Sequence, residues 1–138
     1  MNVHLFSSRD EPVSGQPFEY VERKGLGHPD TICDSVMQVA AEALRSEYSR
    51  RCGRVLHHNL DKALLVAGQS IPAFGGGKVV SPMKLYAGDR ATNRFGDLSV
   101  PVDEIVESAI TKWFCDHLRF VESDHLSFHS EIKPGSIE

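Results

Sequence analysis

Val21-Glu22-Arg23-Lys24-Gly25-Leu26-Gly27-His28-Pro29-Asp30, continuing into Thr31-Ile32-Cys33-Asp34, is the stretch around which this chain is organised. Proline suits the first turn of a helix, because its φ is already helical and its missing N–H would have no partner there. The start of a helix exposes unpaired N–H groups and the positive end of the helix dipole, which together favour a phosphate or another anion. The sequence therefore predicts a glycine-containing turn that enters a helix near Pro29, with His28 just outside an anion-favouring end.

Asp30 and Asp34 lie one helical turn apart, so both carboxylates should project from the same face of this helix. A purely structural interpretation also exists, because acidic residues commonly complement a helix dipole and Gly-X-Gly is commonly only a turn. The combination of an imidazole, two carboxylates and two glycines favours instead a polyphosphate with its divalent cation. Mg²⁺ usually takes one or two carboxylates and completes its shell with phosphates and waters.

Apolar residues at helical spacing predict two helices, over about residues 29–51, ended by Gly53, and over about residues 101–120. The predicted strands cover residues 18–22, 54–58, 63–67, 79–87 and 126–129, with a further short strand considered at 3–6. The order β-α-β-β-β-α-β indicates an α+β fold, a mixed or antiparallel sheet with two helices packed on one face. We divide the chain into an N-terminal arm, residues 1–16, and one α+β domain, residues 17–138.

Three segments carry more specific expectations. Residues 63–67 are apolar throughout, which predicts cover on both faces of that strand. Residues 70–77 contain a proline and three consecutive glycines, which predicts a loop, and Pro82 should interrupt the strand that follows. Lys78 behind the glycines resembles a phosphate cradle, but the spacing is not that of a P-loop. A mobile lid or a close backbone approach at a subunit contact is the alternative.

His57 and His58 stand side by side in the sequence. Adjacent strand residues point to opposite faces, so the two imidazoles cannot bind one metal ion if the strand is regular. A zinc or dinuclear site is therefore disfavoured, and we expect one histidine, taken as His58, to face the site while the other is satisfied elsewhere.

The composition is that of an ordinary globular protein, with 41% hydrophobic and 25% charged residues among 138. A net charge of −4 gives no indication of a general nucleic-acid binder, and no stretch is long and apolar enough to cross a membrane. The N-terminus lacks the pattern of a signal peptide. Three widely spaced cysteines match no zinc or disulfide pattern, so we expect reduced thiols in a cytoplasmic protein.

Gly27-His28-Pro29-Asp30, followed by Ile32 and Asp34, resembles the signature near the start of S-adenosylmethionine synthetases, also called methionine adenosyltransferases. Further blocks resemble the archaeal-type branch of this family, in the same order, at residues 55–59, 61–62, 66–69, 74–77 and 88–92. Five blocks in register over residues 19–136 make the resemblance specific, and they match only the N-terminal portion of the family's chain.

The resemblance implies a fold and a reaction. Synthetases of this family contain three similar α+β domains and work as homodimers with active sites between subunits. Their substrates are ATP and methionine: the methionine sulfur attacks ribose C5′, the triphosphate leaves, and it is then hydrolysed. Mg²⁺ and K⁺ are the implied cofactors, and neither nucleic acid nor a membrane is an implied partner.

The same resemblance assigns roles to residues. His28 is the catalytic group beside the bridging oxygen of the leaving triphosphate, Asp30 is a Mg²⁺ ligand, and Asp34 is the second metal-binding candidate. The ligands of K⁺ are not assigned. The candidates for binding nucleotide or substrate are Glu22, Gly27, His28, His58 and Gln69.

Two of these assignments have alternatives. Glu22 is otherwise a surface charge at the end of a strand. Gln69 follows Gly68 where the bacterial branch carries a glutamate associated with methionine, and an amide cannot provide the same charge for the methionine ammonium.

The family's chain continues well beyond a motif like Gly135-Ser136, and its later domains supply the lysines, arginine and acidic residues that hold the triphosphate. We therefore expect a fragment, a truncation or a short form that needs a partner chain. Two function classes follow. The first is a methionine adenosyltransferase or its His-Asp part, and the second is a non-catalytic nucleotide- or polyphosphate-binding or assembly module.

Overall fold

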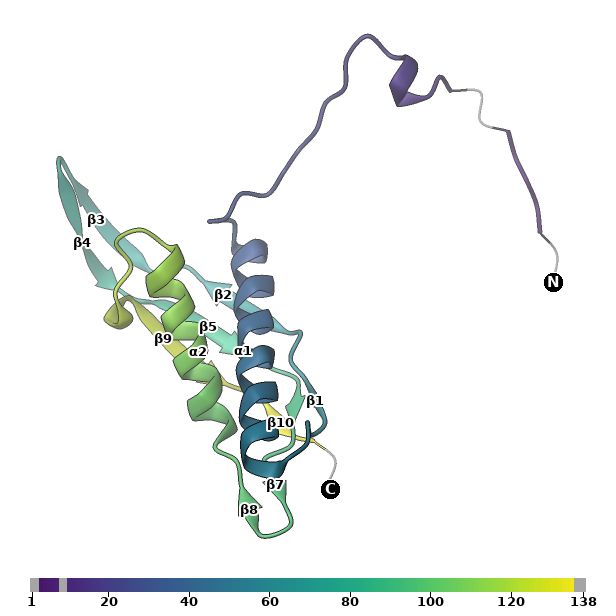
Figure 1. Cartoon of the computed structure of the whole chain (residues 1–138). Helices are drawn as coiled ribbons and strands as arrows, with labels where there is room; N and C mark the ends of the chain where they lie inside the picture. The colour runs from purple at the N-terminus through teal and green to yellow at the C-terminus, as the bar shows by residue number, and fades with distance from the viewer. Residues whose placement is uncertain (1–2, 8–9, 136–138) are drawn as a thin grey trace.

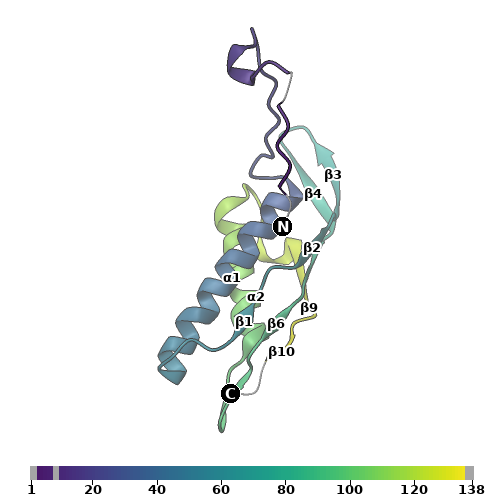
Figure 2. The ribbon, with the colours of Figure 1, turned by 90° about the vertical axis from the view of Figure 1, so that its right-hand side faces the viewer.

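The structure is a computed structural model that describes residues 3–7 and 10–135. Two long helices lie side by side on one face of a group of strands, and the beginning of the chain extends away from this body (Figure 1, Figure 2). The predicted α+β class, with both helices on one face of a mixed sheet, is confirmed. The division into arm and domain stays a prediction, and Ser136 of the Gly-Ser motif lies outside the described residues.

Helix α1 spans Pro29–Cys52, within one residue of the predicted range. Gly53 ends it with a φ of 67°, a left-handed conformation that glycine adopts without a side-chain penalty. One stripe of the helix enters the core, at Ile32, Val36, Met37, Ala40, Leu44 and Tyr48. The hydroxyl of Tyr48 donates a hydrogen bond to the carbonyl oxygen of Thr92 at 2.6 Å, which ties the C-terminal half of α1 to the strands.

Helix α2 spans Val102–His117 and is shorter than predicted. Leu118 is already extended and Phe120 has a φ of 64°, so the chain leaves the helix before residue 120. The helix packs directly against α1, and its fully buried residues are Val106, Ile110 and Phe114. The region between the two helices and the central sheet is therefore the core of the molecule.

The central sheet has the strand order β2-β5-β9. Its strands are Ala63–Val66, Met83–Ala87 and Leu126–Ser130. β2 is antiparallel to β5, whereas β9 is parallel to it, so the sheet is mixed. Leu65, Leu85 and Phe128 lie in one register row, and Leu85 is fully buried in the core beneath the helices.

The opposite face of this sheet is uncovered in the described part of the chain. Leu64 is 60% exposed and Val66 is 41% exposed, while Ala63 and Leu65 are half-buried. The expectation that residues 63–67 are covered on both faces was therefore wrong for this chain. Apolar residues on both faces of a strand cannot distinguish a face covered by the same chain from a face that the chain leaves open.

The predicted loop at residues 70–77 was also wrong, because this segment forms a β-hairpin. Its strands are β3, Gln69–Ala73, and β4, Gly76–Ser81. Gly75 supplies the turn with a φ of 80°. A Cβ at Gly77 would lie 3.0 Å from the carbonyl oxygen of Ile71, so glycine allows the close pairing of the two strands. Pro82 separates β4 from β5, as predicted.

Small pairings complete the fold and correct two boundaries. The short strands are β1, His58–Asn59, β6, Arg90–Ala91, β7, Arg94–Phe95, β8, Leu98–Ser99, and β10, Lys133–Pro134. They form a sheet of order β1-β6-β10 and a β7-β8 pair. Of the predicted strand 54–58 only residue 58 is in a strand, and β6 and β7 lie in a region for which no strand was predicted. The predicted strand at 126–129 is confirmed as β9.

The predicted strands at residues 3–6 and 18–22 are not formed. Both segments lack strand partners among the described residues, and Phe18 and Tyr20 are 65% and 90% exposed. Alternation alone does not make a strand, because the backbone N–H and C=O groups need a neighbouring strand. The regular element found in this part of the described chain is a 3₁₀ turn, Val13–Gly15. Within the residues that the structure describes, neither helix has the length and apolarity needed to cross a membrane.

Candidate functional site

The turn before α1 places His28 at the helix start. The N–H of His28 donates to the carbonyl oxygen of Gly25 at 3.0 Å, and the carbonyl oxygen of His28 accepts the first helical bond, from Ile32, at 2.9 Å. The side chain of His28 is the N-cap: its Nδ1 accepts a hydrogen bond from the backbone N–H of Asp30 at 3.1 Å. Pro29 occupies the first helical position, as predicted.

This cap determines what the imidazole can still do. Because Nδ1 of His28 accepts a hydrogen bond, the neutral ring carries its proton on Nε2. The side chain is 41% exposed, so it is not enclosed by the core. A histidine that caps a helix in this way presents an N–H donor beside the backbone N–H groups of the first turn.

Asp30 is the acidic residue of the first turn, and Lys24 contacts it. The Nζ of Lys24 donates to Oδ2 of Asp30, and Nδ1 of His28 lies 4.0 Å from the same oxygen. The hydrogen bond and charge of Lys24 lower the pKa of Asp30, with a smaller contribution from His28. The lowered pKa keeps this carboxylate ionised, and its side chain is 58% exposed.

Asp34 lies one turn further along the helix and is exposed. It belongs to the surroundings of Lys62, whose pKa is raised chiefly by Asp61 and also by Asp89 and Asp34. Cys33 lies between Asp30 and Asp34 in the sequence, and burial raises the pKa of its thiol. The first turns of α1 are therefore packed on one side against β2 and open on the other.

The chemistry of these donors fits a divalent cation only in part. The described residues contain no group of three or more His, Cys, Asp and Glu side chains arranged for a metal ion. Asp30 and Asp34 supply two exposed carboxylates on successive turns, which is the number that Mg²⁺ commonly takes from a protein when phosphates complete its shell. The residues present therefore suit a metal ion that arrives with a polyphosphate.

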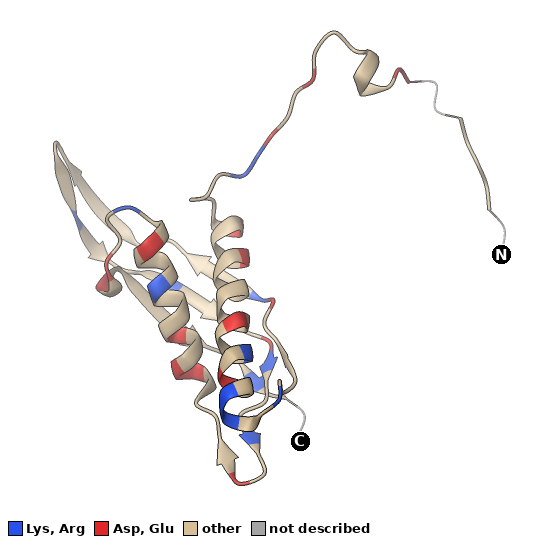
Figure 3. Ribbon diagram, in the orientation of Figure 1, with Lys and Arg blue, Asp and Glu red and all other residues tan. Residues whose placement is uncertain are grey.

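Charge is distributed unevenly along α1. Figure 3 shows acidic residues on the first turns of the helix and basic residues gathered at its opposite end. The last turn carries Arg50 and Arg51, both of which pair with Glu47. The basic residues on the chain just before the helix are Arg23 and Lys24, and Lys62 lies near Asp34.

Glu22 and Gly27 lie in the exposed segment that leads into the turn. A Cβ at Gly27 would have no neighbour within 4 Å, so packing inside this chain does not require glycine there. Any requirement at Gly27 would come from a molecule that approaches the turn from outside.

His58 is not brought to His28 by this chain. Its Nδ1 lies 2.9 Å from the carbonyl oxygen of Leu56, and its ring packs on Tyr48 with centroids 5.5 Å apart. Tyr48 is twenty residues along α1 from His28, which corresponds to about 30 Å of helix. His57 is exposed on the neighbouring position.

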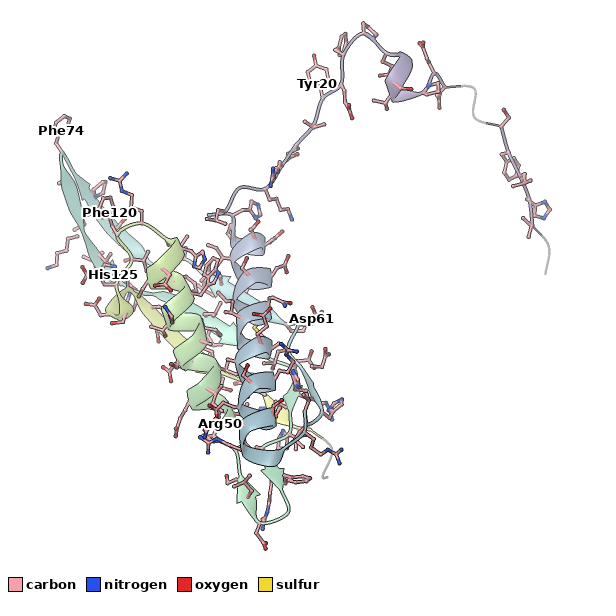
Figure 4. The ribbon with its side chains drawn as sticks, in the orientation of Figure 1. Tyr20, Arg50, Asp61, Phe74, Phe120 and His125 are labelled. Carbon is pink, nitrogen blue, oxygen red and sulfur yellow. The ribbon has the colours of Figure 1, made fainter. Side chains whose placement is uncertain are left out.

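Gln69 begins β3, three residues beyond β2. A Cβ on Gly68 would lie 2.4 Å from the carbonyl oxygen of Ser81, so glycine is required where the chain enters this strand. Gln69 lines a cavity of about 260 Å³ together with Phe120 and His125. Figure 4 shows Phe120 and His125 beside the hairpin, whose tip carries Phe74.

Two features were missed by reasoning from sequence. The contact of Lys24 with Asp30 could have been anticipated, since a flexible lysine stands just before a Gly-X-Gly turn and a helix that begins with an acidic residue. The cavity beside Gln69 depends on the conformation of the segment after α2, including the left-handed Phe120, and no local sequence signal indicated it.

Comparison with known proteins matches the whole chain to one family. The family model described as S-adenosylmethionine synthetase (AdoMet synthetase) covers residues 1–138. The probable S-adenosylmethionine synthase of Aquifex aeolicus is 44% identical over 98% of this chain and 34% of its own length. The S-adenosylmethionine synthases of Methanothrix thermoacetophila and Hyperthermus butylicus are 43% and 38% identical over 99% of this chain and 35% of their own lengths.

The chain thus spans about a third of the length of these curated relatives. The expected resemblance to the archaeal-type branch, in its N-terminal portion, is confirmed. The chain belongs to the S-adenosylmethionine synthetase family.

Proposed function

We propose that this chain carries the His-Asp part of a methionine adenosyltransferase. The reaction joins methionine and ATP to S-adenosylmethionine, by attack of the sulfur on ribose C5′ with triphosphate as the leaving group, followed by hydrolysis of the triphosphate. The observation that carries the proposal is the cap of α1: the Nδ1 of His28 accepts from Asp30, so Nε2–H is a donor at the positive end of the helix.

That geometry suits the electrostatic demand of the reaction. A thioether needs no deprotonation before it attacks, so no general base is required for the first step. The leaving triphosphate gains negative charge at its bridging oxygen, and donors held in place beforehand stabilise that charge in the transition state. The positive end of the helix dipole attracts the polyanion, and Nε2–H of His28 donates to the bridging oxygen as it leaves.

Asp30 and Asp34 are the proposed ligands of Mg²⁺, which supplies positive charge against the triphosphate when bound. Asp30 is exposed and ionised in this chain, with its pKa lowered by Lys24. K⁺ is the second proposed ion, by family resemblance alone. Neither ion has ligands assigned from geometry beyond these carboxylates.

Glu22, Gly27, His58 and Gln69 are the proposed contacts for nucleotide or methionine. Gln69 has support from its place at the edge of a cavity that also contains an exposed aromatic side chain. His58 lies far along α1 from His28, so it could join the site only of another subunit.

A second subunit or a partner chain is part of the proposal. Leu64 and Val66 leave an apolar row exposed on the open face of the central sheet, next to the stacked rings of Tyr86 and His129. Exposed apolar patches of this kind commonly mark contacts between chains. We propose a homodimer or a complementing chain, in the cytoplasm, with active sites completed from both partners.

The alternative is a non-catalytic polyphosphate-binding or assembly module of the same family. The open sheet face, which offers a surface for assembly, favours this alternative for the 138-residue chain on its own. The two functions differ in whether chemistry occurs at the bound nucleotide.

Two preparations, the 138-residue chain and a complete synthetase that contains it, test these functions. The chain is incubated with ATP, methionine, Mg²⁺ and K⁺, formation of S-adenosylmethionine and triphosphate is assayed, and the mass in solution is measured. We expect no more than trace activity and an associated species. A strictly monomeric chain that turns over at about 1 per second or faster, an ordinary enzyme rate, would contradict the need for a partner. If a complete synthetase containing these residues makes no S-adenosylmethionine, the catalytic proposal fails.

A further inference from the structure

Lys24 contacts the residue proposed to bind the metal ion. The turn closed by the hydrogen bond from His28 to Gly25 folds the chain back, so that Lys24 lies over the first turn of α1. Its Nζ donates a hydrogen bond to Oδ2 of Asp30. The same oxygen lies 4.0 Å from Nδ1 of His28. Both partners are more than half exposed, at 56% and 58% of their side chains.

We propose that Lys24 is a built-in counter-ion of Asp30, which a divalent cation must displace before it can coordinate Oδ2 of this carboxylate. The inference rests on the proposed function, because it concerns the same carboxylate. An ammonium group and a metal ion seek the same carboxylate oxygen, and their like charges repel at the distance of direct contact. They therefore cannot both occupy Oδ2 of Asp30.

Lysine is suited to this exchange. Its ammonium is a compact charge on a flexible stem and binds a carboxylate through one point, whereas arginine binds through two parallel bonds and is harder to remove. An exposed pair of this kind contributes little to folding. A role in stability therefore does not account for the contact.

The exchange couples metal binding to the arrival of the polyphosphate. Without phosphate, the displaced ammonium group of Lys24 is exposed to water and has no new anionic partner in place of Asp30. With a triphosphate at the helix start, the displaced ammonium gains a phosphate oxygen as a new partner. Lys24 is thus a positioning residue, which acts on the metal through Asp30.

The test uses Mn²⁺ as a paramagnetic probe with the 138-residue chain. Mn²⁺ binding is followed by electron paramagnetic resonance, and its location by broadening of the amide NMR signals of residues 30 and 31. Lys24→Met should lower the Kd for Mn²⁺ by roughly two- to five-fold, the range expected from measured exposed ion pairs. Lys24→Arg should bind Mn²⁺ no more tightly than the native chain.

Three controls separate the contact from general charge effects. Arg23→Met removes the neighbouring positive charge but leaves the Lys24–Asp30 pair, so it should change the Kd less than Lys24→Met. Lys112→Met breaks a comparable exposed pair, with Asp116 on α2, and should leave the Kd unchanged. In an Asp30→Asn background, Lys24→Met should have no effect on Mn²⁺ binding.

Tripolyphosphate supplies a further arm. If it gives Lys24 a new partner, the advantage of Lys24→Met in Mn²⁺ affinity should shrink or disappear when tripolyphosphate is present.

The proposal is overturned if Lys24→Met leaves the Kd for Mn²⁺ unchanged, or if Arg23→Met lowers this Kd as much as Lys24→Met does. It is also overturned if neither the native chain nor any variant shows Mn²⁺-dependent broadening of the residue 30 amide signal. These outcomes are independent of the proposed reaction, which is judged by S-adenosylmethionine formation in the complete enzyme. If the complete enzyme is inactive but the Kd for Mn²⁺ still depends on Lys24, the proposed reaction is contradicted and the proposed exchange at Asp30 is supported.

Discussion

The two ends of helix α1 have opposite surroundings. Toward the C-terminal end, Leu44 and Tyr48 have no exposed surface, and Tyr48 is hydrogen-bonded to Thr92, which directly follows β6. At the N-terminal end, the side chains of His28 and Asp30 are 41% and 58% exposed and are held by a cap and a flexible lysine. The buried end fixes the helix in the molecule, which leaves the first turn free to present donors and carboxylates to a ligand.

The largest effect on folding should come from Leu44→Ala at the buried end. Leu44 lies in the middle of the core, so its truncation should cost about 2–5 kcal/mol of unfolding free energy. Urea unfolding measures the change. The matched control is Leu26→Ala in the turn before the helix, where leucine is 57% exposed, and its cost should stay within about 0.5 kcal/mol. Equal costs would mean that the two ends are not packed differently.

Tyr48→Phe should have a smaller effect. It keeps the ring in place and removes the hydroxyl that donates to Thr92, which leaves a buried carbonyl oxygen without this donor. The expected cost is about 1–3 kcal/mol. Tyr20→Phe in the segment before α1 is the control, since Tyr20 is 90% exposed, and it should leave the urea midpoint unchanged. A neutral Tyr48→Phe would show that the hydroxyl does not anchor this end of α1.

The smallest effect on stability should come from the charged residues at the C-terminal end of α1. Arg50 and Arg51 lower the pKa of Glu47 from 4.5 to about 2. A carboxyl group whose pKa is lowered by folding stabilises the fold at pH values above its ordinary pKa. For Glu47 this contribution is lost as the pH falls from 4.5 toward 2.

Glu47→Gln should therefore be less stable than the native chain near neutral pH, and the difference should narrow between pH 4.5 and 2. Thermal unfolding across this range measures it. A difference in Tm that is constant with pH would show that Glu47 is not paired in solution.

The bounds of α1 could be predicted from the sequence, whereas the strand pairings could not. The helix start at Pro29 and the end at Gly53 were predicted correctly, because proline and glycine act on the backbone locally. The position of His28 just outside the helix start was predicted from the same local order, whereas its cap on Asp30 emerged only from the structure. By contrast, the hairpin at residues 70–77 was assigned to a loop, since glycine and proline give no alternation and the pairing of Ile71 with Lys78 depends on strand contacts.

The segment before α1 shows the opposite error. Residues 18–22 alternate as a strand does, but no described strand pairs with them. Pairing and exposure depend on neighbours that a local pattern does not contain, and for the same reason the open face of Leu64 and Val66 was expected to be covered. Of the candidate site, the link between His28 and Asp30 is local in sequence, whereas the separation of His58 from them is set by the length of α1.

We propose that the exposed end of α1 acts on the leaving triphosphate through His28. The most direct test is His28→Ala in the complete enzyme, with turnover, ATP binding and unfolding measured on the same protein. His28→Ser serves as the control, because serine can cap the helix but is too short to reach the leaving group.

We expect both variants to lower turnover by about 100- to 1,000-fold, as loss of one transition-state donor does, while ATP binding is largely retained. Serine should restore any loss of stability seen with alanine without restoring turnover. Unchanged turnover with weakened ATP binding would contradict the claim, since His28 would then be a ground-state contact only.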